Sequence, residues 1–274
     1  MTTTEANSIR HLSVAGGTIA YTVRGDGPLV LLSPGLGDVR ASFRAMAPYL
    51  VAAGYRVATA DLRGHGDSSG GFASYGDDET AGDLAALLDQ LGAPAIIVGN
   101  SLSAGAAVVL AARRPELVAG MILIGPFVRD QPTSRFTRLL LRIALWRPWA
   151  ALTWRSYLPS LYAGRKPDDF DAYRRAVGAA MRRPGHAAAF SLTARTSHAS
   201  AAEALARVAA PSLIVMGDKD PDFPDPRGEA DWIAAQIGGD VILVAEAGHY
   251  PHAQQPDTVN PAVLRFINEV TPHA

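Results

Sequence analysis

The sequence predicts an α/β protein in which a mostly parallel β-sheet is covered by helices on both faces. Short apolar, β-branched segments alternate with helical segments along most of the chain. From the third segment onward the apolar residues are mostly continuous, as strands buried on both faces require. The chain has 274 residues, enough for one large α/β domain with an insertion.

The individual elements follow from these patterns in chain order. Strands are expected at residues 18–23, 29–32, 55–60, 95–98, 121–124, 212–216 and 241–244. Helices are expected at residues 43–53, 80–91, 104–114, 231–237 and 261–270. In an open parallel sheet the functional site lies beyond the carboxyl ends of the strands, so polar residues that follow strands are the first candidates.

One segment interrupts the alternation of strands and helices. Residues 128–200 show helical patterns broken by prolines and contain no convincing strand. We therefore expect a core domain of residues 1–127 and 201–274, with residues 128–200 inserted into it as a helical cap.

The composition of the chain limits the kinds of molecule that it is expected to bind. The net charge of −1 gives no overall attraction to nucleic acid. The absence of cysteine excludes disulfides and thiolate chemistry. Residues 1–11 are polar, and no apolar run approaches the roughly 18 residues of a membrane span. These features predict a cytoplasmic protein without nucleic-acid partners or stable membrane insertion, and they leave its oligomeric state open.

The segment at residues 95–105 is the most informative. An apolar run leads to Ser101, which stands between small residues and is followed by an alanine-rich helical run. This pattern predicts a sharp strand-to-helix turn that forces Ser101 toward positive φ. Gly99 and Ser103 are small enough for such a turn, and the next helix would point its N-terminus at whatever Ser101 attacks.

Two later turns carry candidate partners for Ser101. Apolar runs end at Asp220 and, further on, at His249. A serine nucleophile needs a base within hydrogen-bond reach, and the base needs a group that orients it. We assign His249 as the base and Asp220 as the acid that orients it. Asp130, after the preceding strand, is the alternative acid.

The tetrahedral intermediate of such a reaction needs hydrogen-bond donors for its oxyanion. The backbone N–H of Leu102, directly after the serine, is one candidate. The loop at residues 33–38 should supply the other, because Gly35 and Gly37 let its backbone approach closely. Within that loop we assign the N–H of Leu36.

Taken together, these motifs resemble the α/β-hydrolase superfamily, in particular its cap-bearing serine hydrolases. The matching pieces lie in the expected order over nearly the whole chain, at residues 34–37, 61–68, 99–103, 217–220 and 248–249. The resemblance implies an eight-stranded sheet, a Ser101–His249–Asp220 triad, and a cap inserted after the sixth core strand that shapes the substrate pocket. Pro34, Asn100 and Ser103 depart from the usual pattern, and a similar Pro-Gly loop occurs in members that act as ligand receptors.

The expected cap is basic. Residues 131–200 contain 12 Arg and Lys against 3 Asp, with Arg135, Arg138 and Arg142 at helical spacing. A solvated face explains these charges, and attraction of an anionic substrate is the alternative. Trp146, Trp154 and Tyr157 are candidates for the pocket lining, although core packing of the cap explains them equally well.

Two further histidines and the remaining aspartates near Asp220 have structural explanations. His65 is best explained as a structural turn residue. His252 is expected at the surface, with a supporting role near the site as the alternative. Most of the aspartates around Asp220, namely Asp218, Asp222 and Asp225, are expected to be solvated turn residues.

The sequence thus predicts a serine hydrolase that acts on a carboxylic ester or lactone of a small-to-medium organic substrate. An anionic substrate is one possibility within this class. The chemistry needs no metal or organic cofactor. An acyltransferase or a C–C bond hydrolase would use the same residues. A ligand receptor or regulator with little turnover is the alternative outside enzymology.

Overall fold

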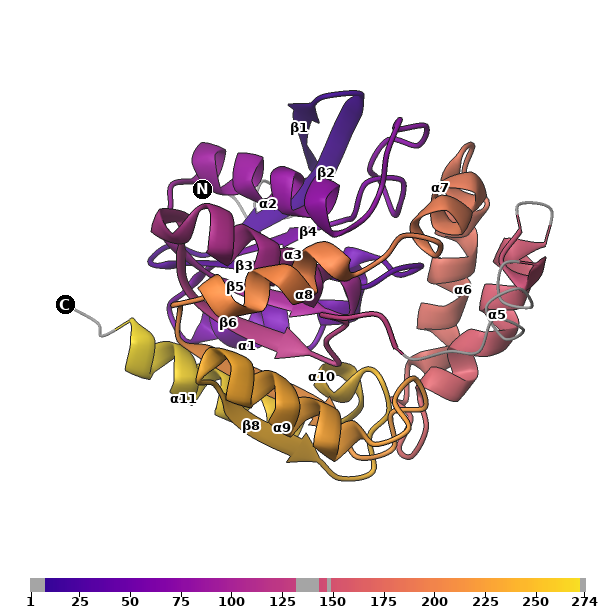
Figure 1. Ribbon diagram of the computed structural model, residues 1–274. Coiled ribbons are helices and arrows are strands. Elements are labelled where there is room, and N and C mark those ends of the chain that lie inside the picture. The colour runs from indigo at the N-terminus through magenta and orange to yellow at the C-terminus, as the bar shows by residue number, and fades with distance from the viewer. Residues whose placement is uncertain (1–7, 132–142, 147–148, 272–274) are drawn as a thin grey trace.

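The computed structural model describes residues 8–131, 143–146 and 149–271 of the chain. It contains one eight-stranded sheet with strand order β1-β2-β4-β3-β5-β6-β7-β8 (Figure 1). The strands are β1 (Arg10–Val14), β2 (Gly17–Arg24), β3 (Leu29–Ser33), β4 (Arg56–Ala60), β5 (Ala95–Asn100), β6 (Val118–Ile124), β7 (Ser212–Gly217) and β8 (Asp240–Val244). The expected mostly parallel, eight-stranded α/β sheet is confirmed.

Strand directions follow from the connections. β2 runs antiparallel to both β1 and β4, and the pairs from β4 through β8 are parallel. β1 was missed by the sequence patterns because it is a short edge strand with mainly exposed or half-buried residues. A polar edge strand has neither the continuous apolar run of a buried strand nor a strong contrast between its two faces.

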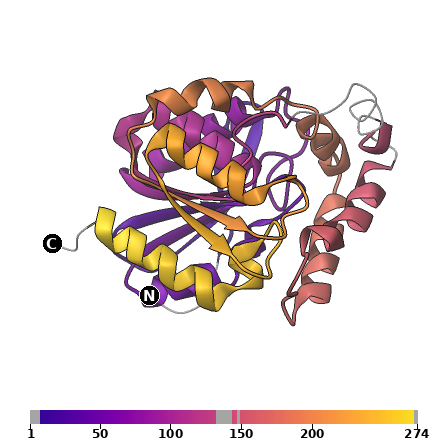
Figure 2. The same cartoon turned by 60° about the horizontal axis from the view of Figure 1, so that its bottom comes forward.

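Each face of the sheet has its own hydrophobic core and its own helices. Along β5, Ile97 packs on one side and its neighbours Ile96 and Val98 on the other, as the two-residue period of a strand requires. The first face is covered by α2 (Asp77–Leu91), α3 (Leu102–Arg113), α8 (Ala199–Ala204) and α9 (Pro226–Ile237), and the second by α1 (Met46–Ala52) and α11 (Pro256–Val270) (Figure 2).

Helix boundaries differ from the expected ones mainly at N-termini. α9 and α11 each begin five residues earlier than expected, at Pro226 and Pro256. Both prolines lie in the first turn, where the missing N–H leaves no hydrogen bond unmade. The expected helix at 43–53 is divided into a 3₁₀ turn, η2 (Arg40–Phe43), and α1.

The segment between β6 and β7 is helical in its described residues. It contains α5 (Ala150–Leu161), α6 (Phe170–Met181), α7 (His186–Thr193), α8 and the 3₁₀ turn η4 (Leu205–Arg207). α5, α6 and α7 lie beside the sheet, whereas α8 packs against α3 of the first face (Figure 1). Arg135, Arg138 and Arg142 lie outside the described residues, and the division into core and cap stays a prediction.

Two short elements complete the chain: η3 (Pro115–Leu117) before β6 and α10 (Pro251–Gln254) after β8. Among the helices that the structure describes, none combines the length and apolar character needed to cross a lipid bilayer.

Candidate active site

Ser101 occupies the strained turn that its neighbours predict. It lies between β5 and α3 with φ 57° and ψ −120°. Positive φ is uncommon for a residue with a Cβ and costs free energy that surrounding contacts must offset. The Ser101 N–H donates to the carbonyl of Ile124 (2.9 Å), which ties the turn to the end of β6.

The residues around the Ser101 turn must be small because backbone segments approach one another closely there. A Cβ on Gly99 would lie 2.4 Å from the carbonyl oxygen of Ser103, so only glycine fits there. The Ser103 hydroxyl takes part in hydrogen bonds to Ser33 Oγ (2.8 Å) and the Pro34 carbonyl (2.6 Å). Ser103, which departs from the usual glycine, therefore links the Ser101 turn to the loop at residues 33–38.

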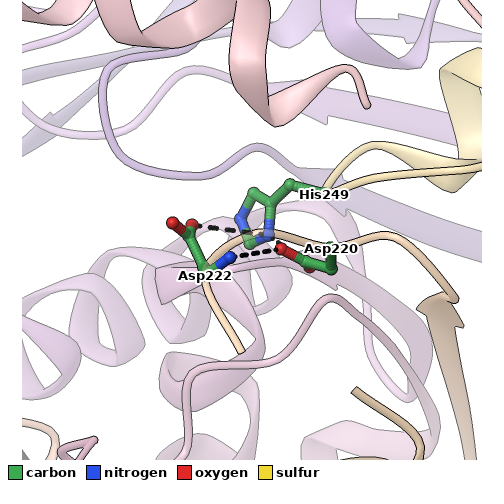
Figure 3. Close-up of side chains that lie close together, drawn as sticks. All are labelled: Asp220, Asp222 and His249. Atoms are coloured by element: carbon green, nitrogen blue, oxygen red, sulfur yellow. Dashed lines mark hydrogen bonds and ion pairs between the residues drawn. The ribbon is translucent and has the colours of Figure 1, made fainter. Parts of the chain in front are cut away.

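Asp220 and His249 meet beyond the ends of β7 and β8. His249 Nδ1 lies 2.8 Å from Asp220 Oδ2, and both side chains are buried (Figure 3). In the neutral imidazole this hydrogen bond places the proton on Nδ1 and leaves Nε2 as an acceptor. The loops approach because Gly217 lacks a Cβ, which would otherwise lie 2.1 Å from the Gly248 carbonyl oxygen.

A second carboxylate, from Asp222, was missed as a possible contributor. Asp222 Oδ2 lies 3.7 Å from His249 Nδ1, and Asp222 Oδ1 accepts a 2.5 Å hydrogen bond from the Tyr157 hydroxyl (Figure 3 shows the aspartates and His249). Burial raises the pKa of Asp222, while the nearby His249 opposes that rise. The sequence held no signal that separated Asp222 from its neighbouring acids, because four aspartates lie within eight residues.

The imidazole of His249 has a strongly shifted pKa. Burial by itself lowers its pKa, but the Asp220 carboxylate, with help from Asp222, outweighs burial and raises the value to about 9. A histidine with this surrounding holds a proton well, which suits a group that must stabilise positive charge during a reaction.

Ser101 follows β5 and His249 follows β8, and these two strands are separated in the sheet by β6 and β7. The Asn100 side chain donates to the backbone carbonyls of Ile124 (3.0 Å) and His249 (3.3 Å), and so it joins the two segments. A Cβ on Gly125 would lie 3.0 Å from His249 Nδ1, which places the imidazole directly over the end of β6. No hydrogen bond joins the Ser101 hydroxyl to His249 in the described part of the chain. Such contacts are often long in unliganded enzymes and shorten when substrate binds.

The loop at residues 33–38 lies against Ser101. A Cβ on Gly35 would come within 2.7 Å of Ser101 Cβ. Leu102 is the first residue of α3, so its N–H has no partner within the helix. Among the described residues the Leu36 N–H likewise donates no hydrogen bond to the protein. Both backbone donors assigned from the sequence are therefore available.

Two aromatic residues of the inserted segment hold this loop from outside. The Trp154 indole donates a 2.8 Å hydrogen bond to the Gly37 carbonyl. The Tyr173 hydroxyl hydrogen-bonds to Asp38, whose buried carboxyl group has its pKa raised to about 7 mainly by burial. Sequence periodicity placed Trp154 among apolar residues and could not reveal its donor role.

The three expected pocket residues have different surroundings. Trp154 is buried against the loop at residues 33–38, next to Phe190 (ring centroids 5.2 Å apart). Tyr157 is bound to Asp222. Trp146 is 53% exposed and packs edge-on against Trp149. Only Trp154 and Tyr157 touch residues of the candidate site.

The alternative candidates have other partners. Asp130 accepts hydrogen bonds from Ser197 (2.5 Å) and the His198 N–H (2.8 Å). Asp225 caps α9. His65 is buried with Nδ1 2.9 Å from the Arg63 carbonyl, in agreement with a structural role.

The expectation of a surface position for His252 was wrong. Its ring is buried and stacks on Phe43, and burial lowers its pKa to about 3. The residue follows Pro251 at the start of α10, and this short helix turns its side chain inward toward Ser42 (3.2 Å).

One donor set in the described chain could also hold a cation. Single ligand atoms of Asp220, Asp222 and His249 lie within 4.8 Å of one another. The same three atoms account for the acid–base pair, and the 2.8 Å separation of Nδ1 and Oδ2 is that of an ordinary hydrogen bond.

Comparison with known proteins places these features in a family. The model of the alpha/beta hydrolase family matches residues 29–262. A 2-(acetamidomethylene)succinate hydrolase from Mesorhizobium japonicum is 28% identical over 94% of this chain and 95% of its own length. A human monoglyceride lipase is 26% identical over 88% of this chain and 80% of its own length.

Solved structures show the same fold. A bromoperoxidase from Bacillus anthracis superposes with a TM-score of 0.83 at 22% identity, covering 95% of this chain and all of that one. A thermophilic esterase from Thermogutta terrifontis has a TM-score of 0.81 at 24% identity, covering 96% of this chain and 99% of that one. With its eight-stranded sheet and a family match over most of its length, this chain belongs to the α/β-hydrolase family.

Proposed function

We propose that this chain is a serine hydrolase that cleaves a carboxylic ester or lactone through Ser101, His249 and Asp220. The observation that carries the proposal is the strained Ser101 turn beside a buried His249–Asp220 hydrogen bond. A serine held in a strained turn and an oriented imidazole are the two parts that nucleophilic catalysis by serine needs.

The reaction would proceed by acyl transfer to Ser101 and then to water. His249 Nε2 takes the Ser101 proton while Oγ forms a bond to the carbonyl carbon. The resulting oxyanion accepts hydrogen bonds from Leu36 and Leu102 N–H. His249 then protonates the leaving alcohol oxygen, and the acyl-enzyme is hydrolysed by water that His249 deprotonates. In a lactone the leaving alcohol stays attached to the acyl group.

The natural substrate is proposed to carry negative charge. The inserted segment is rich in arginine, and the relative from Mesorhizobium japonicum is named for a succinate derivative. If charge attracts the substrate, kcat/KM for an anionic ester falls with ionic strength faster than for a neutral analogue. Equal salt dependence of the two esters would contradict this part of the proposal.

A fluorophosphonate probe tests the nucleophile. Wild-type protein should be labelled, Ser101→Ala should not, and Ser13→Ala, which changes an exposed serine of β1, should be labelled like wild type. Labelling that survives in Ser101→Ala would place the nucleophile elsewhere. Product analysis with added alcohol then separates hydrolysis from acyl transfer, and a diketone substrate tests C–C cleavage.

A binding protein with little turnover is the second candidate. The missing Ser101–His249 hydrogen bond in the described residues and the Pro34-Gly35 loop favour it. A wild-type protein that resists the probe but binds a ligand would support this candidate over the enzyme.

A further inference from the structure

The outer face of α5 and α6 carries four arginines around one hollow. A space of about 340 Å³ is lined by Arg155 of α5, by Arg174, Arg175 and Gly178 of α6, and by Arg182, which directly follows α6. Arg174 and Gly178 are four residues apart and therefore share one face of α6, and Arg182 is the C-cap residue of that helix. A Cβ on Gly178 would meet only the guanidinium of Arg182, at 3.7 Å, so the hollow stays open at its centre.

The four arginines of the hollow lack the carboxylate partners that several other arginines of the protein have. Arg40, Arg44, Arg63 and Arg129 each form an ion pair with a carboxylate. Among the residues that the structure describes, no acidic side chain pairs with any of the four arginines of the hollow. Guanidinium groups gathered without counter-charge favour an anion between them, and phosphate oxygens match their planar, forked donors.

Apolar surface adjoins the arginines. A second hollow of about 170 Å³ shares Arg155, Arg174, Gly178 and Arg182, and its apolar walls include Leu152. The Leu152 side chain is 58% exposed, and Trp149, three residues earlier, is 39% exposed. A helix face that combines arginine with exposed leucine and tryptophan is typical of helices that lie in a membrane interface.

The position of this face allows contact with an extended surface. In both views α5 and α6 lie together at the side of the molecule opposite the chain terminus that follows α11 (Figures 1 and 2). Trp154 and Leu158 of α5 and Val177 of α6 pack into the buried cluster that includes Leu36. By contrast, Arg155, Arg175 and Arg182 are exposed and Arg174 is half-buried.

We propose that the outer face of α5 and α6 docks on the surface of a bilayer that contains anionic phospholipids. The four guanidinium groups bind lipid phosphates, and Leu152 and Trp149 enter the headgroup layer. A soluble phosphate ester would leave the exposed Leu152 side chain without a partner, which favours the lipid surface. Docking of this kind is peripheral and needs no spanning helix, and it does not depend on catalysis at Ser101.

Vesicle sedimentation tests the proposal. Wild-type protein should bind vesicles of phosphatidylcholine mixed with phosphatidylglycerol, should not bind phosphatidylcholine alone, and should dissociate as salt rises. Each arginine near an anionic bilayer strengthens binding roughly fivefold, so Arg174→Gln combined with Arg182→Gln should weaken partitioning roughly 20- to 30-fold. Leu152→Ser should also weaken it.

The control is a pair with the same change in net charge. Arg24→Gln combined with Arg265→Gln removes two exposed arginines from β2 and α11, and it should bind nearly as wild type does. Equal loss in both pairs would overturn the proposal, as would wild-type protein that ignores phosphatidylglycerol vesicles or that binds glycerol phosphate in solution equally well. Ser101→Ala should bind vesicles as wild type does, so this result is independent of the proposed catalytic activity.

Discussion

The indole N–H of Trp154 donates a 2.8 Å hydrogen bond to the carbonyl oxygen of Gly37. A residue of α5 thereby fixes the backbone of the loop whose neighbouring N–H, from Leu36, is the proposed oxyanion donor. α5 thus contacts the candidate site through the backbone of this loop.

Trp154→Phe should lower kcat with a smaller effect on KM, because it frees the loop without removing a substrate contact. We expect a loss of roughly tenfold, below the 100- to 1000-fold that follows deletion of an oxyanion donor. Trp149→Phe is the matched control, since it deletes an indole–carbonyl hydrogen bond (to Ile143, 2.6 Å) away from the loop. Equal losses in both variants would show that α5 acts only through stability.

The two carboxylates beside His249 should be unequal in catalysis. Asp220 lies 2.8 Å from His249 Nδ1 and Asp222 lies 3.7 Å away. Asp220→Asn should lower kcat by roughly four orders of magnitude, since an amide no longer fixes the required tautomer. Asp222→Asn should keep kcat within about tenfold. Steady-state kinetics on both variants, with circular dichroism as a check of folding, measure the difference. A larger loss of kcat in Asp222→Asn than in Asp220→Asn would make Asp222 the acid that orients His249.

Activity should rise with pH into the alkaline range. The pKa of His249 is raised to about 9, because the two carboxylates outweigh burial, and general base catalysis needs the unprotonated imidazole. The profile of kcat/KM should therefore increase with pH until about 9. Asp222→Asn should move its midpoint to lower pH, whereas Asp218→Asn should not, because Asp218 accepts its hydrogen bond from the Ala247 N–H (3.3 Å). A plateau beginning near pH 6 would contradict the shifted pKa.

The buried Asp38 should make stability depend on pH. Its folded-state pKa is about 7 against an ordinary 3.8, so the folded protein binds a proton that the unfolded chain releases. The contribution of Asp38 to stability should accordingly fall as pH rises from about 4 to about 7 and then level off, with an upper limit of about 4 kcal/mol.

Asp38→Asn should remove that slope, because its amide stays neutral, while the exposed Asp168→Asn should retain it. Urea denaturation at pH 5 and pH 8 measures the difference. Identical slopes in wild type and Asp38→Asn would show that the Asp38 carboxyl group is ionised in the folded protein at both pH values.

Gly35→Ala should reduce activity by crowding Ser101. The new Cβ would lie 2.7 Å from Ser101 Cβ and 3.2 Å from Asn100 Oδ1, so the loop or the serine turn must shift. We expect kcat to fall at least tenfold, as for small misplacements of a catalytic group. Gly82→Ala in α2 meets no atom within 4 Å and should keep activity while adding roughly 0.5–1 kcal/mol of stability. Activity unchanged in Gly35→Ala would contradict the close packing of this loop on Ser101.

Much of the fold could be read from local patterns. Largely apolar runs such as residues 95–98 and 212–216 predicted the buried strands, because a strand buried on both faces consists mainly of apolar residues. The turn at Ser101 was predictable as well, since a sharp strand-to-helix turn restricts its neighbours to small residues. Edge strand β1 was not, because its polar residues are those of an exposed segment.

Tertiary structure alone decided which groups meet. The sequence favours Asp220 over Asp218, Asp222 and Asp225 as the acid, but only the path of the loop after β7 brings Asp220 to 2.8 Å and Asp222 to 3.7 Å from His249. The hydrogen bond from Trp154 to Gly37 likewise joins segments more than a hundred residues apart. The burial of His252 reverses the surface position that its local sequence predicted. Secondary structure depends on neighbours along the chain, whereas contacts between loops depend on how the sheet twists and how the helices pack, which no short stretch of sequence specifies.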